Sequence, residues 1–274
     1  MKKSLFTELY SLLTMSKEAK VKAVPTLLKA LMSGELDITH EEVVHPIAPP
    51  TYQNLTTVVR PDALKKRSAL HTLEGKANFL HAITHIEFAA IDLALDAAYR
   101  FRHLPLQYYI DWLEVADDEV RHFLMLETIL NEMGYYYGDF PVHSGLFEAA
   151  ERSLTLLDRM AVVPRYLEAN GLDANPKMIQ KMQNVKGPFS QEIVQALNII
   201  LEEEIIHVQK GDTWFSYACE KENVSKEIYF EAIERIIPGS SKAKPNLNIE
   251  ARKAAGFSCK ELKTFNKNIS CETT

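Results

Sequence analysis

Two glutamate–histidine pairs with a spacing of three residues stand out as candidate metal ligands. Glu119 precedes His122, and Glu204 precedes His207. Residues at positions i and i+3 lie on the same side of a helix, so each pair can bind one metal ion. Mixed carboxylate and imidazole ligands suit iron or manganese, whereas a thiolate zinc site would need cysteines that these motifs do not contain.

Two single glutamates, Glu87 and Glu168, each fall on the predicted helix that precedes one of these motifs. A glutamate in a helix-bundle core is costly unless it is paired or bound to a cation. One glutamate from each of two helices, combined with Glu-x-x-His from two others, is the pattern of di-iron and di-manganese carboxylate bundles. We therefore predict a centre of two metal ions, iron or alternatively manganese; a buried polar network without metal is the competing interpretation. The predicted ligands are Glu87, Glu119, His122, Glu168, Glu204 and His207.

Other glutamates and histidines fit this pattern less well. The segment from Glu42 to His45 also has the motif spacing, but it lies in a proline-rich segment without helical periodicity. Glu202 and Glu203 are also near His207 in sequence. We prefer Glu204 because it lies on the apolar stripe and keeps the i, i+3 spacing.

Four long helices are expected to position these residues. Apolar residues recur every three or four positions over about 70–102, 105–133, 144–170 and 191–221. We expect Gly134 to end the second helix and Gly171 the third, and Pro164 to kink or split the third. Strand patterns are almost absent. The expected fold is an all-α, ferritin-like four-helix bundle with additional N- and C-terminal helices.

The flanking segments are expected to pack on this bundle. Residues 1–60 predict two short helices, with Ser16 capping the second, followed by an extended segment. The bundle itself is expected to span 61–222. Residues 223–274 predict further helices of the same domain, one of which begins with a capping box formed by Ser258 and Glu261.

Composition limits the classes of function. The 274 residues carry a net charge of −6, which does not indicate a general nucleic-acid binder. Three cysteines without a CxxC spacing favour a reduced, cytoplasmic location. No apolar stretch is long enough to predict a membrane span, and we expect no membrane partner.

The residues around the second helix also resemble a known group of proteins. The segment Asp118-Glu119-Val120-Arg121-His122 matches the (D/E)-E-x-R-H signature of ferritin-like di-iron proteins. The wider segments HIEFAAIDLALDAAYRF, RYLEANGLD and EEIIHVQKGDTWF resemble the uncharacterised DUF455 family over roughly 60–260. The resemblance implies that Asp118 hydrogen-bonds His207 and that Glu203 hydrogen-bonds His122. Ile206 departs from the signature, because an arginine is expected at that position.

Further polar residues on the first helix have weaker assignments. His85 is a candidate for an accessory role near the centre, and His81 is a weaker one, although such residues more often fill space or form hydrogen bonds. Asp92 and Asp96 point away from the Glu87 stripe, and we expect them to pair with Arg100 or Arg121.

Four glutamates with two histidines resemble the O2-activating oxidases and hydroxylases more than ferritins. We therefore expect an oxidoreductase that acts on a small molecule or, as in one related family, on a modified base in tRNA, with an electron-donor protein as partner. A ferroxidase or other metal-handling protein, and a helical module with a structural metal, are the alternatives. The terminal helices can cover a substrate channel or form a homodimer interface.

Overall fold

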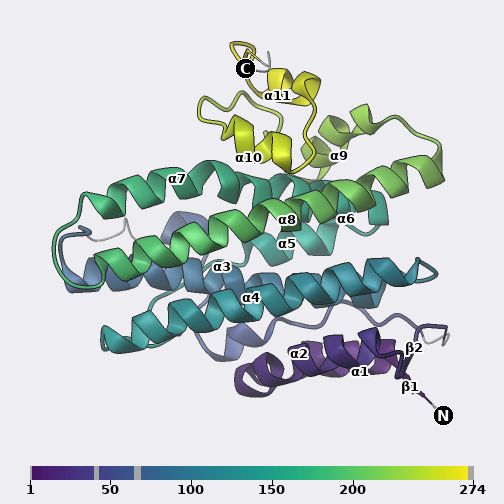
Figure 1. Ribbon diagram of the computed structural model, residues 1–274, viewed down its shortest axis with the longest axis horizontal. Helices are drawn as coiled ribbons and strands as arrows, with labels where there is room; N and C mark the ends of the chain where they lie inside the picture. The colour runs from purple at the N-terminus through teal and green to yellow at the C-terminus, as the bar shows by residue number, and fades with distance from the viewer. Residues whose placement is uncertain (1, 40–42, 65–68, 271–274) are drawn as a thin grey trace. The chain divides into compact units, whose positions relative to one another are not determined.

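The computed structural model describes residues 2–39, 43–64 and 69–270. The regular elements of these residues are almost all helices, which confirms the all-α class (Figure 1). The exception is a pair of two-residue parallel strands, β1 (Lys3–Ser4) and β2 (Leu36–Asp37). The chain separates into two compact units, Met1–Phe147 with Val185–Ala196, and Glu148–Asn184 with Leu197–Thr274. Within the described ranges, no helix combines the length and the apolar character needed to cross a membrane.

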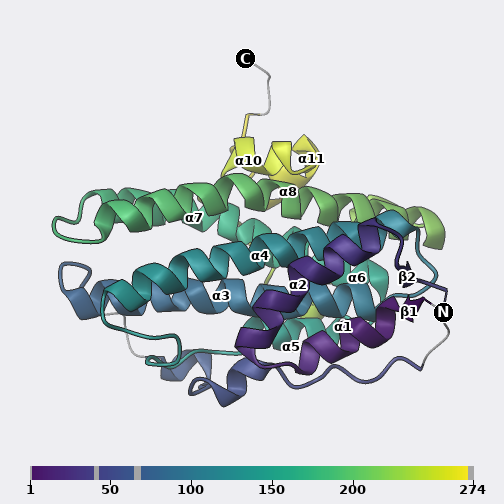
Figure 2. The ribbon, with the colours of Figure 1, turned by 60° about the horizontal axis from the view of Figure 1, so that its bottom comes forward.

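The first unit begins with helices α1 (Leu5–Thr14) and α2 (Lys17–Met32). The predicted cap is confirmed, because the Ser16 side chain accepts a hydrogen bond from the Ala19 backbone N–H. Gly34 follows α2 with a φ of 72°, a left-handed conformation that glycine adopts without strain. Both helices pack on the long helices that follow, α1 on α3 and α2 on α4 (Figure 2).

Helices α3 (Leu73–Arg100) and α4 (Leu106–Glu132) are the main elements of the first unit and lie side by side (Figures 1 and 2). The sequence predicted both of them to within a few residues. Gly134, with a φ of 81°, follows α4 as expected. A 3₁₀ turn, η1 (Thr51–Asn54), interrupts the segment expected to be extended, and a second, η2 (Pro61–Ala63), follows it.

The ion pairs on α3 correct one expectation. Asp96 pairs with Arg100, as predicted, with its Oδ1 2.5 Å from Arg100 Nη2. Asp92 instead pairs with Lys20 of α2, and both side chains are buried. A partner 72 positions earlier in the chain cannot be found from the spacing along one helix.

The second unit contains the largest departure from the predicted elements. The expected third helix is divided into α5 (Gly145–Arg152), which spans the boundary between the units, α6 (Leu156–Val162), the π-helix η3 (Val163–Glu168) and α7 (Ala169–Gln183). Leu154, in the break after α5, is 70% exposed. The predicted end at Gly171 is also wrong. Gly171 lies within α7, so the helix continues through it.

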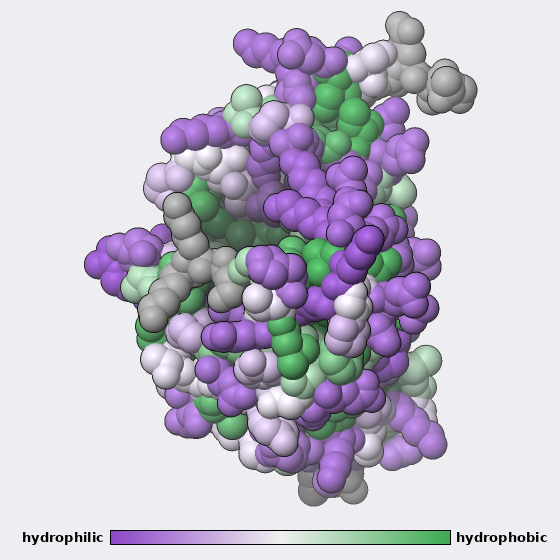
Figure 3. All heavy atoms as spheres, turned by 90° about the vertical axis from the view of Figure 1, so that its left-hand side faces the viewer, coloured by the Kyte–Doolittle hydropathy of each residue, from purple (hydrophilic) through white to green (hydrophobic). Residues whose placement is uncertain are grey.

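Helix α8 (Ser190–Glu222) confirms the fourth predicted helix. The tail of the second unit adds η4 (Lys226–Ile228), α9 (Tyr229–Ile236), α10 (Ile249–Ala254) and α11 (Cys259–Phe265). The capping box of Ser258 and Glu261 is present at the start of α11. Hydrophilic side chains cover most of the face shown in Figure 3, and apolar ones lie between them.

Candidate metal centre

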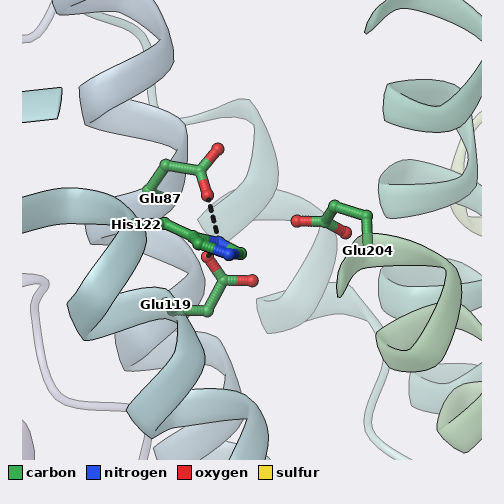
Figure 4. A group of neighbouring side chains, drawn as sticks. All are labelled: Glu87, Glu119, His122 and Glu204. Carbon is green, nitrogen blue, oxygen red and sulfur yellow. Dashed lines mark hydrogen bonds and ion pairs between the residues drawn. The ribbon is translucent and has the colours of Figure 1, made fainter. Parts of the chain in front are cut away.

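Three of the predicted ligands lie together within the first unit. Glu87 comes from α3, and Glu119 and His122 come from α4. The Nδ1 atom of His122 is 3.1 Å from Glu87 Oε2 and 3.6 Å from Glu119 Oε2. Figure 4 shows the two carboxylates approaching the imidazole ring, with the bond from Glu87 dashed. Two carboxylate oxygens and one ring nitrogen therefore converge on a single point.

The apolar stripes of the two helices explain why these polar residues are buried. Val115 and Leu126 lie on the same stripe of α4 as Glu119 and His122, and both are fully buried. Glu87 occupies a stripe position on α3 in the same way. The exposed fractions are 4% for Glu87, 1% for Glu119 and 0% for His122. Burial of the apolar residues fixes which face of each helix points to the core, and the three ligands lie on that face.

The two carboxylates strongly perturb the histidine. Burial alone would lower the pKa of His122, but hydrogen bonds to Glu119 and Glu87 and their negative charges outweigh burial and raise it to about 11. In the protein without metal, the ring is thus a buried cation between two carboxylates. A metal ion at this point would replace that proton, so metal binding is expected to release protons.

The second unit contains the matching motif on α8. The Nδ1 atom of His207 is 3.8 Å from Glu204 Oε1, so the same ring nitrogen faces the glutamate three residues earlier as in the first motif. His207 is fully buried and Glu204 is partly buried, whereas Glu202 is exposed. Within the first unit, Glu87, Glu119 and His122, drawn in Figure 4, offer ligand atoms close enough together to hold a metal ion.

Glu168 is the last residue of the π-helix η3 and is partly buried. The sequence placed it on a regular α-helical stripe. A π-helix has more residues per turn than an α-helix, so the direction of every later side chain differs from the one that α-helical spacing gives. The assignment of Glu168 as a ligand stays a prediction.

The residues predicted to support the centre have the following neighbours. His85 Nδ1 lies 2.9 Å from the Tyr137 hydroxyl, and its Nε2 lies 3.1 Å from the His143 carbonyl oxygen. Asp118 accepts a hydrogen bond from Arg121, one turn further along α4. Glu203 is partly buried on α8. Their predicted roles beside the metal-bound histidines stay predictions. Glu42, part of the excluded motif, lies outside the described residues.

Comparisons with known proteins support the resemblance to the DUF455 family. The profile of the family described as "Protein of unknown function (DUF455)" matches residues 13–263. The chain belongs to this family. The chain is also 41% identical, over 216 residues, to an "Uncharacterized protein" of Haemophilus influenzae. That match covers 75% of this chain and 72% of the relative. No solved structure matches the chain.

Proposed function

We propose that this DUF455 protein is a ferritin-like dimetal oxidoreductase. Glu87, Glu119 and His122 of the first unit, and Glu168, Glu204 and His207 of the second, would hold two metal ions in a four-helix bundle. Iron is the metal that we propose, and manganese is the alternative that the same ligands accept. The substrate would be a small molecule or a modified base, and an electron-donor protein would return the centre to its reduced form.

The observation that carries this proposal is the arrangement around His122. Two buried carboxylates from two helices approach one ring nitrogen, and α8 repeats the glutamate–histidine geometry. Carboxylate oxygens and imidazole nitrogens are the donors of non-haem iron and manganese sites. The described residues therefore fit such a centre by donor type, by burial and by the ring nitrogen that they present.

The glutamates and histidines would have different roles at the metal site. The glutamates would supply the negative charge that offsets a divalent cation, and the buried histidines would supply neutral imidazole donors. Burial of Glu87, Glu119 and His122 limits access of water to the ligands. When bound, a pair of iron ions supplies O2 activation and electron transfer, which no side chain in this set provides.

Metal analysis tests the proposal directly. The protein is purified without chelators, loaded with Fe(II) under anaerobic conditions and desalted, and iron per chain is measured. The absorption spectrum is then recorded after exposure to O2. We expect two irons per chain and a ferric oxo-bridged spectrum. Glu119→Ala and Glu204→Ala should each lose metal and the spectrum.

Glu202→Ala is the matched control, because this glutamate is exposed on the same helix two residues before Glu204. It should bind metal like the unchanged protein. Absence of iron, or a single inert zinc ion per chain, would refute the oxidoreductase and leave a helical module. Mineral formation without oxidation of any organic substrate would instead favour a ferroxidase.

A further inference from the structure

The π-helix η3 is the unusual element of the second unit, because a π-helix is rare and often marks a functional site. Pro164, its second residue, has no backbone N–H and crowds the carbonyl four residues earlier, so a regular α-helix cannot pass through this point unchanged. The direction of the Glu168 side chain, at the end of η3, therefore depends on the contacts that stabilise the π-helix.

Arg165 lies inside this turn and is fully buried. Its Nε donates to Asp212 Oδ1 at 2.7 Å, and its Nη2 donates to Glu261 Oε1 at 2.8 Å. Asp212 belongs to α8 and Glu261 to α11, so one guanidinium joins the π-helix to two other elements of the unit. Such charge-assisted bonds fix orientation more firmly than neutral ones.

Three aromatic rings complete the surroundings of the Arg165 guanidinium. Its central carbon lies 4.4 Å from the ring centre of Tyr229, 4.6 Å from that of Phe257 and 5.0 Å from that of Phe215. The Tyr229 hydroxyl also donates to the backbone carbonyl of Arg165 at 3.0 Å. Both the side chain and the backbone of this residue are thus held. We call Arg165, Asp212, Glu261 and Tyr229 the Arg165 clasp.

The Arg165 clasp meets α8 directly after the second metal-ligand motif. Gly211 follows His207 by four residues, and a Cβ added to it would lie 2.4 Å from Pro164 Cβ. The π-helix therefore touches the α8 backbone one turn beyond His207, and the Arg165–Asp212 bond lies at the next residue. The contact fixes the position of η3 along the helix that carries Glu204 and His207.

We propose that Arg165 is a positioning residue that holds the π-helix against α8 and so directs Glu168 toward the metal centre. This inference rests on the proposed function, because it needs Glu168 as a ligand. Arg165 itself does not bind metal. Its guanidinium fork sets where the carboxylate three residues later is presented, as residues around metal ligands do elsewhere.

The test compares metal binding by Arg165→Lys, Glu168→Ala and the unchanged protein. Lysine keeps the charge but cannot form the two-pronged bond to Asp212 and Glu261. Fe(II) and Mn(II) are titrated anaerobically, bound metal per chain is measured after desalting, and circular dichroism checks folding. We expect Arg165→Lys to behave like Glu168→Ala, with one ion lost or bound about 10- to 100-fold more weakly.

Arg159→Lys is the matched control, because Arg159 is also fully buried and lies on α6 just before the π-helix. It should retain both ions. If Arg165→Lys does not fold, Tyr229→Phe decides, since it removes only the bond to the Arg165 carbonyl and should weaken one ion. Full binding by folded Arg165→Lys or by Tyr229→Phe, or equal loss in Arg159→Lys, would overturn the inference. Fewer than two ions in the unchanged protein would instead refute the dimetal centre itself.

Discussion

Lys20 and Asp92 show how much a single buried charge depends on its partner. The Lys20 side chain is completely buried, and its Nζ donates to Asp92, to Thr51 Oγ1 at 3.0 Å and to the Leu13 carbonyl at 3.4 Å. Burial raises the pKa of Asp92, and the positive charge of Lys20 acts in the opposite direction. Removal of either residue would therefore leave the other buried without a partner of opposite charge.

Replacing Lys20 by methionine should destabilise the first unit strongly. The change leaves the Asp92 carboxylate buried without its cation, which costs about 3–5 kcal/mol in comparable cases. The midpoint of urea denaturation, followed by circular dichroism, measures the loss. The double variant Lys20→Met/Asp92→Leu should recover most of it, because neither charge then remains. Equal destabilisation of the single and double variants would argue against the pair.

Among the helical elements, two glycines show the difference between a required glycine and a tolerated one. Gly211 of α8 lies against Pro164 of the π-helix, with no room for a Cβ. Gly171 of α7 has nothing within 4 Å of the place where a Cβ would be. Both are helical, so local conformation alone does not distinguish them.

Alanine substitutions at these two positions should have opposite effects. Gly171→Ala should stabilise the protein by about 0.5–1 kcal/mol, since alanine loses less backbone entropy in a helix. Gly211→Ala should destabilise it by about 1–3 kcal/mol, because the new methyl group pushes the π-helix away. Thermal denaturation of the two variants provides the comparison. An unchanged melting temperature for Gly211→Ala would show that the contact with Pro164 yields easily.

At the scale of the whole molecule, buried histidines couple stability to pH. Burial and the charge of nearby His85 lower the pKa of His81 from 6.5 to about 4. Burial likewise lowers the pKa of His85 to about 4. Between pH 6.5 and about pH 4, these histidines take up protons in the unfolded chain but not in the folded one. The contribution of His81 and His85 to stability should therefore be complete above about pH 6.5 and be lost as the pH decreases toward 4.

Denaturation midpoints measured between pH 4.5 and pH 7 check this dependence. His81→Gln should show a smaller decrease toward acid pH, because glutamine retains an acceptor for the Gly138 N–H, now 2.9 Å from His81 Nε2, but does not titrate. His71→Gln is the control, since His71 is exposed, and it should keep the full decrease. The same slope in all three proteins would mean that other groups control the acid response.

Features that depend on neighbours along the chain could be predicted from the order of residues. Apolar spacing located α3, α4 and α8, and the i, i+3 rule placed Glu119 beside His122 and Glu204 beside His207. The cap at Ser16 and the capping box at Ser258 were found for the same reason. Each of these interactions spans at most one helical turn, so its partners are visible in the printed order of residues.

Features whose partners are far apart in the chain could not be predicted and are known from the folded structure. Lys20 meets Asp92 across 72 positions, and Arg165 meets Glu261 across 96. The approach of Glu87 to His122 depends on the packing of α3 against α4. The π-helix also belongs here. Pro164 indicated that the helix would be irregular there. Contacts with Gly211, Asp212 and Glu261 make the irregularity a π-helix and so set the direction of Glu168. Long-range packing selects among backbone conformations that local preference leaves nearly equal in energy.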